Sequence, residues 1–118
     1  RKDPRVAWHF FDPQTKVQVR ANGRVTVHHD DEVTRTAWAA VPEANKRNYA
    51  TPNAPGLPID DPSLGQAQAG AYTAAYANFT VLIAEITFID WLQLDNERHQ
   101  RAQFTWTGSD WRVAWVAP

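Results

Sequence analysis

The chain has 118 residues, of which 43% are hydrophobic and 21% charged, and these proportions are typical of a folded globular protein rather than a disordered one. Its net charge of −1 gives no basic footprint, so we expect neither nucleic acid nor a membrane surface as a partner. The absence of cysteine excludes a disulfide framework, a thiolate nucleophile and a Cys-ligated zinc site.

The aromatic content is high, with six Trp, three Tyr and five Phe, which suits a β-rich core or a pocket for a planar ligand. The most apolar run, residues 79–94, includes Glu85 and Asp90 and is too short and too charged to span a bilayer. We therefore expect a cytoplasmic protein of one domain. The chain starts at Arg1 and contains no Met, so we also expect either a fragment or a trimmed chain.

The first third of the chain has the patterns of β-strands. Residues 6–11 are apolar and aromatic, residues 12–15 predict a turn, and residues 16–29 alternate between apolar and polar side chains. The dipeptide Asn22-Gly23 interrupts this alternation. It predicts either a tight hairpin or a bulge in one long, bent strand.

The middle of the chain has helical and loop patterns. Asp30-Asp31-Glu32 offers an acidic cap and first turn, and apolar residues follow at helical spacing. This predicts a helix over residues 31–41, which we expect to pack Val33 and Ala37 against the barrel. Pro42 ends this helix and begins a second short one through Tyr49. Residues 51–71 contain four Pro and three Gly and predict a long loop.

The last third returns to strands. Residues 78–92 predict one long strand, and residues 101–107 and 111–116 predict a hairpin joined by residues 108–110. An order of strands, inserted helices and strands again predicts a mainly β (α+β) fold, an antiparallel barrel with helical cover.

Several kinds of catalytic or metal site have little support. His28 and His29 are adjacent on a predicted strand and therefore point to opposite faces, so we expect no metal there. Neither Ser63 nor Ser109 lies in a nucleophile elbow, and the glycines form no phosphate-binding loop.

The segment from Trp91 to Arg101 is more informative. It ends one strand with an indole and returns on the next with His99 and Arg101, which share a strand face. An indole, an imidazole and a guanidinium close together suit a planar, anionic ligand. The alternative is a solvated, charged hairpin with a core tryptophan.

Four segments resemble the pyridoxamine 5′-phosphate oxidase-like family of FMN-binding split β-barrels. Trp91 to Arg101 is similar to the family's Trp-x₅-Arg-Leu-His-Asp-Arg motif, and the ending from Trp111 to Pro118 is similar to its C-terminal signature. Asp3-Pro4-Arg5-Val6 resembles Asn-Pro-Arg-Val, and the stretch from Gln18 to Arg24 resembles Gln-Val-x-x-x-Gly-Lys/Arg. The resemblance covers residues 3–118, loosely between 50 and 75, and favours the bent strand at Asn22-Gly23.

The resemblance implies a single FMN-binding split-barrel domain over residues 1–118 that lacks its N-terminal strands. It implies FMN as the cofactor, with His99 as the catalytic candidate and these cofactor-binding residues: Gln18, Asn53, Trp91 and Arg101. It further implies a homodimer that acts as an FMN-dependent oxidoreductase on an unknown small-molecule substrate. Glu97 stands where the family has a substrate-binding Arg, so the alternative is a flavin-binding or dimerisation module without turnover.

Overall fold

A computed structural model describes residues 3–67 and 71–118 of the chain. The chain divides into two compact units, Arg1–Thr26 with Ile83–Pro118, and Val27–Leu82. The first unit holds most of a β-sheet and the second holds the helices. Each unit is described by itself below.

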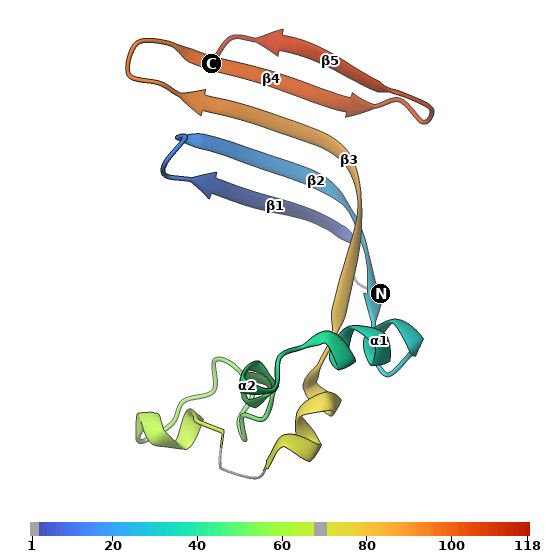
Figure 1. The fold of residues 1–118 in the computed structure, drawn as a ribbon, viewed down its shortest axis with the longest axis vertical. Coiled ribbons are helices and arrows are strands. Elements are labelled where there is room, and N and C mark those ends of the chain that lie inside the picture. Colours follow the sequence, from blue (N-terminus) through green and yellow to red (C-terminus); the bar gives the residue numbers. More distant parts are fainter. Residues whose placement is uncertain (1–2, 68–70) are drawn as a thin grey trace. The chain divides into compact units, whose positions relative to one another are not determined.

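The sheet has five antiparallel strands whose spatial order is also their order in the chain, β1-β2-β3-β4-β5 (Figure 1). The strands are β1 (Arg5–Asp12), β2 (Val17–His28), β3 (Val81–Leu94), β4 (His99–Trp106) and β5 (Trp111–Val116). Every strand predicted from the sequence is confirmed, and so is the hairpin through residues 108–110. Gly108 has a φ of 102°, the left-handed conformation that glycine adopts without steric cost.

β2 runs unbroken through Asn22 and Gly23, so the bent strand is confirmed and the hairpin is wrong. The physical reason lies in the neighbouring strand. A Cβ atom on Gly23 would lie 2.0 Å from the backbone oxygen of Glu85 in β3, a distance that no side chain tolerates. Gly23 therefore permits a close approach of two backbones rather than a turn.

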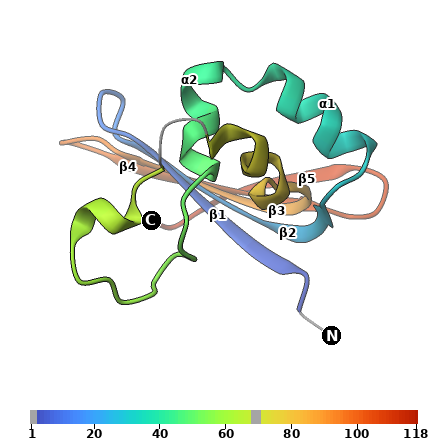
Figure 2. The same cartoon turned by 90° about the horizontal axis from the view of Figure 1, so that it is seen from below.

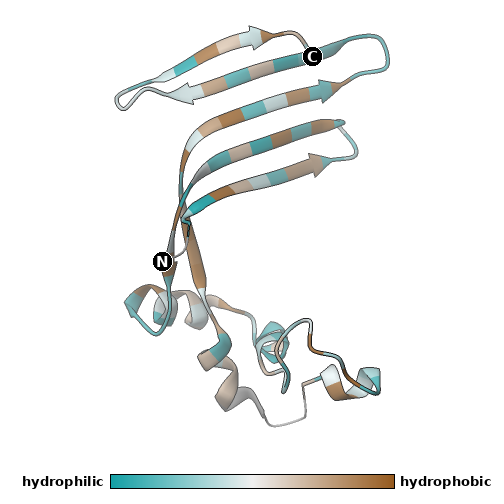
Figure 3. Cartoon of the chain, turned by 180° about the vertical axis from the view of Figure 1, so that it is seen from behind, coloured by the Kyte–Doolittle hydropathy of each residue, from teal (hydrophilic) through white to brown (hydrophobic). Residues whose placement is uncertain are grey.

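The strands alternate polar and apolar side chains, which appear as teal and brown bands in Figure 3. Because β4 pairs without interruption with both β3 and β5, the alternation gives the sheet two unlike faces. We call them the polar face (Gln18, Arg20, Asn22, Asp90, Leu92, His99, Arg101, Gln103 and Arg112, with the apolar Phe88, Leu94 and Val116 among them) and the apolar face (Trp8, Phe10, Val19, Ile89, Trp91, Phe104, Trp106, Trp111, Val113 and Trp115).

The second unit contains α1 (Glu32–Ala40), α2 (Glu43–Lys46) and three 3-10 helices, η1 (Arg47–Tyr49), η2 (Pro62–Gly65) and η3 (Ala71–Asn78). Figure 2 shows α1 leading into α2, beside η3. The predicted helix over residues 31–41 is confirmed. Asp31 and Thr34 form a reciprocal capping box, in which the Asp31 carboxylate accepts from the Thr34 backbone N–H at 2.9 Å.

An aromatic cluster forms the core of this second unit. The ring of Trp38 lies 5.1–5.9 Å, centre to centre, from the rings of Tyr49, Tyr76 and Phe79. The apolar stripe predicted for α1 did not include Trp38, which is the residue that anchors the helix.

No helix in the described part of the chain is long and apolar enough to cross a membrane.

We predict that Gly23→Ala destabilises the protein by about 1–3 kcal/mol or more, because the added methyl group overlaps the β3 backbone. Urea unfolding measures the loss. Gly65→Ala is the control, since its methyl group would meet only the flexible end of Ile59, at 3.2 Å. Equal stability of Gly23→Ala and wild type would contradict the close approach of β2 and β3.

Candidate functional site

Three of the five predicted site residues lie on the polar face of the sheet. In the β3–β4 register, Leu92 pairs with Arg101 and Leu94 pairs with His99. The Leu94 backbone N–H donates to the Lys16 carbonyl at 2.9 Å, which pairs Leu94 of β3 with Lys16 at the start of β2. Antiparallel pairing continued by two residues from this point brings Gln18 of β2 opposite Leu92 of β3. Gln18, Leu92 and Arg101 thus form one row across three adjacent strands.

Asp90 fixes the guanidinium of Arg101. The residue Asp90 is 7% exposed, and its carboxylate accepts from Arg101 Nε at 2.9 Å and Nη2 at 2.6 Å, and from Gln103 Nε2 at 3.3 Å. The two hydrogen bonds from Arg101 form a planar fork, the geometry that makes such pairs strong and specific. Among the described residues no hydrogen bond engages Nη1 of Arg101, which is left to donate to another group.

The same cluster sets the charge of the polar face. Hydrogen bonds from Arg101 hold the pKa of Asp90 below its usual value, with smaller contributions from Gln103 and from the charge of Arg20. Burial acts in the opposite direction, because it disfavours the charged carboxylate. The carboxylate is therefore ionised near neutral pH and largely balances Arg101.

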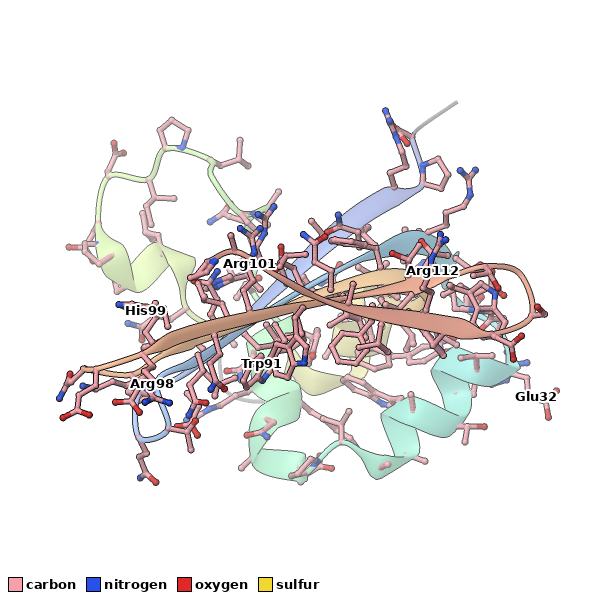
Figure 4. The ribbon with its side chains drawn as sticks, turned by 90° about the horizontal axis from the view of Figure 1, so that it is seen from above. Glu32, Trp91, Arg98, His99, Arg101 and Arg112 are labelled. Carbon is pink, nitrogen blue, oxygen red and sulfur yellow. The ribbon has the colours of Figure 1, made fainter. Side chains whose placement is uncertain are left out.

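Trp91 does not lie on the same face of the sheet as Arg101 and His99, which corrects the expectation from the sequence that the three groups lie close together. Trp91 pairs with Ala102, the neighbour of Arg101, so its side chain lies on the apolar face. Figure 4 shows Trp91 on one side of the sheet, and Arg101 and Arg112 on the other. On its own face Trp91 contacts Trp115 edge-on, with ring centres 6.3 Å apart.

Asn53, the fifth predicted residue, lies in the second unit. Its side-chain amide donates to the Leu64 carbonyl at 3.0 Å. It lines a pocket of about 460 Å³ together with Asn48, Tyr49 and Asn78. The amide and hydroxyl groups of this pocket are neutral, so it suits hydrogen bonding rather than the binding of charge.

His28 and His29 have separate partners. His28 Nδ1 lies 2.7 Å from the Asp31 carboxylate, and His29 Nδ1 lies 3.1 Å from the Phe79 carbonyl. Within residues 3–67 and 71–118, no three His, Asp or Glu side chains gather as metal ligands would.

Asp90, Gln103 and Arg20 also belong to the site, although they were not among the residues expected from the sequence. The available signal was the carboxylate of Asp90, flanked by apolar residues in a long strand, with an arginine on the strand that returns beside it. A buried charge of that kind requires a partner, and Arg101 provides it.

Comparison with solved structures places this arrangement in a known fold. A pyridoxamine 5′-phosphate oxidase-related, FMN binding protein from Nostoc punctiforme PCC 73102 superposes with a TM-score of 0.74 at 20% identity, over 98% of this chain and 63% of that one. The chain has the fold of that FMN-binding protein. The predicted antiparallel split-barrel fold is thereby confirmed.

A second structure agrees. PhzG from Burkholderia lata 383, in complex with tetrahydrophenazine-1-carboxylic acid, superposes with a TM-score of 0.67 at 14% identity, over 98% of this chain and 59% of that one. This chain thus spans less than two thirds of either protein. No protein-family model and no curated protein gives a significant match to the sequence.

The Asp90–Arg101 pair predicts a loss of stability in acid. The pKa of Asp90 is lowered in the folded state. Its ionised carboxylate therefore adds to the free energy of unfolding at any pH above the pKa of an unfolded Asp, about 3.9, and this contribution is lost as pH falls through the folded pKa. Asp90→Asn should therefore unfold more easily at pH 7, by roughly 1–3 kcal/mol, and should lose less stability on acidification below about pH 4. Urea unfolding at several pH values measures both effects, and an unchanged pH profile would contradict the pairing.

Proposed function

We propose that this chain binds FMN on the polar face of its sheet and acts as an FMN-dependent oxidoreductase on a small-molecule substrate. The observation that carries the proposal is the row of Gln18, Leu92 and Arg101 on three adjacent strands. Support also comes from the fold, which is that of a protein whose structure is described as FMN-binding.

The chemistry of the row fits a flavin. Gln18 offers a carboxamide, which donates and accepts as the pyrimidine edge of the ring requires. Leu92 offers an apolar surface between two polar groups. Arg101 has two nitrogens engaged by Asp90, so it suits a hydrogen bond from Nη1 to a ring carbonyl better than the binding of a phosphate charge.

His99 is the residue we propose for contact with the substrate or for proton transfer. It is exposed, it pairs with Leu94, and it lies two residues from Arg101 on the same face. Bound FMN would supply the hydride chemistry, and the protein would supply orientation and charge near the ring. A histidine suits proton transfer because its ordinary pKa lies close to neutrality.

We also propose a homodimer, in which the apolar face contributes to the contact. Several of its aromatic and aliphatic side chains are exposed, including Phe10 (59%), Val113 (56%) and Trp115 (73%). Because the sheet separates Trp91 from Arg101 within one chain, Trp91 can touch a flavin bound by Arg101 only from a second subunit. Sedimentation velocity at micromolar concentration measures the oligomeric state.

In the second unit, Asn53 stays a proposed cofactor contact.

The exposed apolar face also favours a second function, a flavin-binding or dimerisation module without turnover. Glu97, which stands where the related enzymes have a substrate-binding Arg, is consistent with that alternative. The two functions differ in whether bound flavin is reduced by a donor.

Arg101→Lys tests the cofactor site. Lysine keeps the charge beside Asp90 but lacks the planar fork, so the additional hydrogen bond to flavin is lost. We expect the Kd for FMN, measured by quenching of flavin fluorescence, to rise roughly tenfold. Arg112→Lys is the matched control, since Arg112 lies on the same face in β5, outside the row. Equal affinity in Arg101→Lys and wild type would remove Arg101 from the site.

The substitution His99→Gln distinguishes an FMN-dependent oxidoreductase from a flavin-binding module without turnover. We expect FMN affinity to stay within about twofold and the anaerobic rate of flavin reduction by NADH or NADPH to fall roughly tenfold, because the side chain proposed to contact and orient the donor is lost. Stopped-flow absorbance of the flavin band measures the rate. A wild-type protein that binds FMN but is reduced by neither donor would favour the module.

A further inference from the structure

A buried carboxylate lies on the polar face of the sheet between two arginines. The side chain of Asp90 is 9% exposed, whereas that of Arg101, its partner on β4, is 34% exposed. On the other side, the pairing of Leu94 with Lys16, continued by four residues, brings Arg20 of β2 opposite Asp90. Among the residues of the polar face defined above, Asp90 is the only acidic one. It therefore carries the negative charge that balances this part of the face.

The balance depends on Asp90 because neither arginine has another anion beside it on this face. Arg101 donates to the carboxylate from Nε at 2.9 Å and from Nη2 at 2.6 Å, so its charge is held close to Asp90. The charge of Arg20 helps to lower the pKa of Asp90, so these two groups also interact. A neutral side chain at position 90 would leave both cations uncompensated.

The charge of a flavin depends on its oxidation state. The oxidised ring is neutral, whereas two-electron reduction leaves the pyrimidine end of the ring negative at neutral pH. A free cation beside that end binds the reduced ring more tightly than the oxidised ring, because charges attract strongly where water is partly excluded. An ion pair in the same place discriminates much less between the two. Protein charge near the ring thus sets how readily the bound flavin is reduced.

We propose that Asp90 is a positioning residue that sets the reduction potential of bound FMN, by orienting the Nη1 donor of Arg101 and balancing its charge. This inference rests on the proposed function, because it requires a flavin beside Arg101. Asp90 keeps the affinities for oxidised and reduced FMN closer together than Arg20 and Arg101 alone would. The bound flavin then has a lower potential and passes electrons to an acceptor more readily.

The test compares the midpoint potential of FMN bound to wild type and to Asp90→Asn, by equilibration with a reference dye during anaerobic reduction. Asparagine keeps the shape and one acceptor oxygen but removes the charge. We expect reduced FMN to gain affinity over oxidised FMN by roughly tenfold, a rise of about 30 mV for a two-electron couple. Asp90→Glu keeps the charge, so its affinity ratio should stay within about twofold of wild type. Glu85→Gln is the matched control, since it removes a carboxylate from an exposed position of the same strand.

Arg20→Gln gives a second readout that leaves the buried pair intact. Arg20 is exposed, and the loss of its cation should shift the affinity ratio several-fold in the opposite direction, towards oxidised FMN. This variant decides the question if Asp90→Asn does not fold. An unchanged potential in Asp90→Asn, or in Arg20→Gln where Asp90→Asn is unfolded, would overturn the proposal. An equal rise of the potential in Glu85→Gln would overturn it as well.

Failure of the proposed function has a different signature. In that event Arg101→Lys leaves the affinity for FMN unchanged, and the role of Asp90 beside a flavin fails with it. Weaker FMN binding in Arg101→Lys, together with an unchanged potential in Asp90→Asn, would keep the cofactor site and overturn the role of Asp90 alone.

Discussion

The uninterrupted register of β3, β4 and β5 is the constraint on which the site depends. Because no residue is inserted along these ladders, each side chain's face follows from its place in the pairing. Arg101, Gln103 and Asp90 therefore gather on one face, while Trp91, Ala102 and Trp115 gather on the other. A slip of one residue between β3 and β4 would put Asp90 among the aromatic rings and leave its charge without a partner.

The pairing of Asp90 with Arg101 also changes what Arg101 can do. An arginine with no partner on a sheet surface is a mobile cation that binds phosphate or carboxylate groups. Here the fork of hydrogen bonds from Nε and Nη2 fixes the guanidinium plane and balances most of its charge. What is left is an oriented donor at Nη1, which discriminates ligands by the position of an oxygen atom rather than by their charge.

Local patterns in the sequence were sufficient to predict the strands, the capped helix at Asp31 and the final hairpin, because caps, turns and alternation act over a few residues. The face occupied by Trp91 was not predictable in this way. It depends on how many residues form the turn between Leu94 and His99. That number decides whether the even-numbered or the odd-numbered residues of β4 share a face with Trp91 of β3. Asn22-Gly23 was likewise ambiguous, because the backbone that approaches Gly23 belongs to a strand far along the chain. Asp90 was overlooked because its partner is also on another strand.

The order of the strands has a consequence for how the chain folds. Three of the four strand pairings join segments that are close in sequence, whereas β2 and β3 are separated by residues 29–80. Pairing of β2 with β3 must close that long loop before it gains any contacts, so we expect this step to limit the rate of folding. Loop-closure entropy grows only slowly with length, at about 0.6 kcal/mol for each doubling. The segment between these two strands can therefore lengthen or shorten considerably in evolution with little effect on the stability of the sheet.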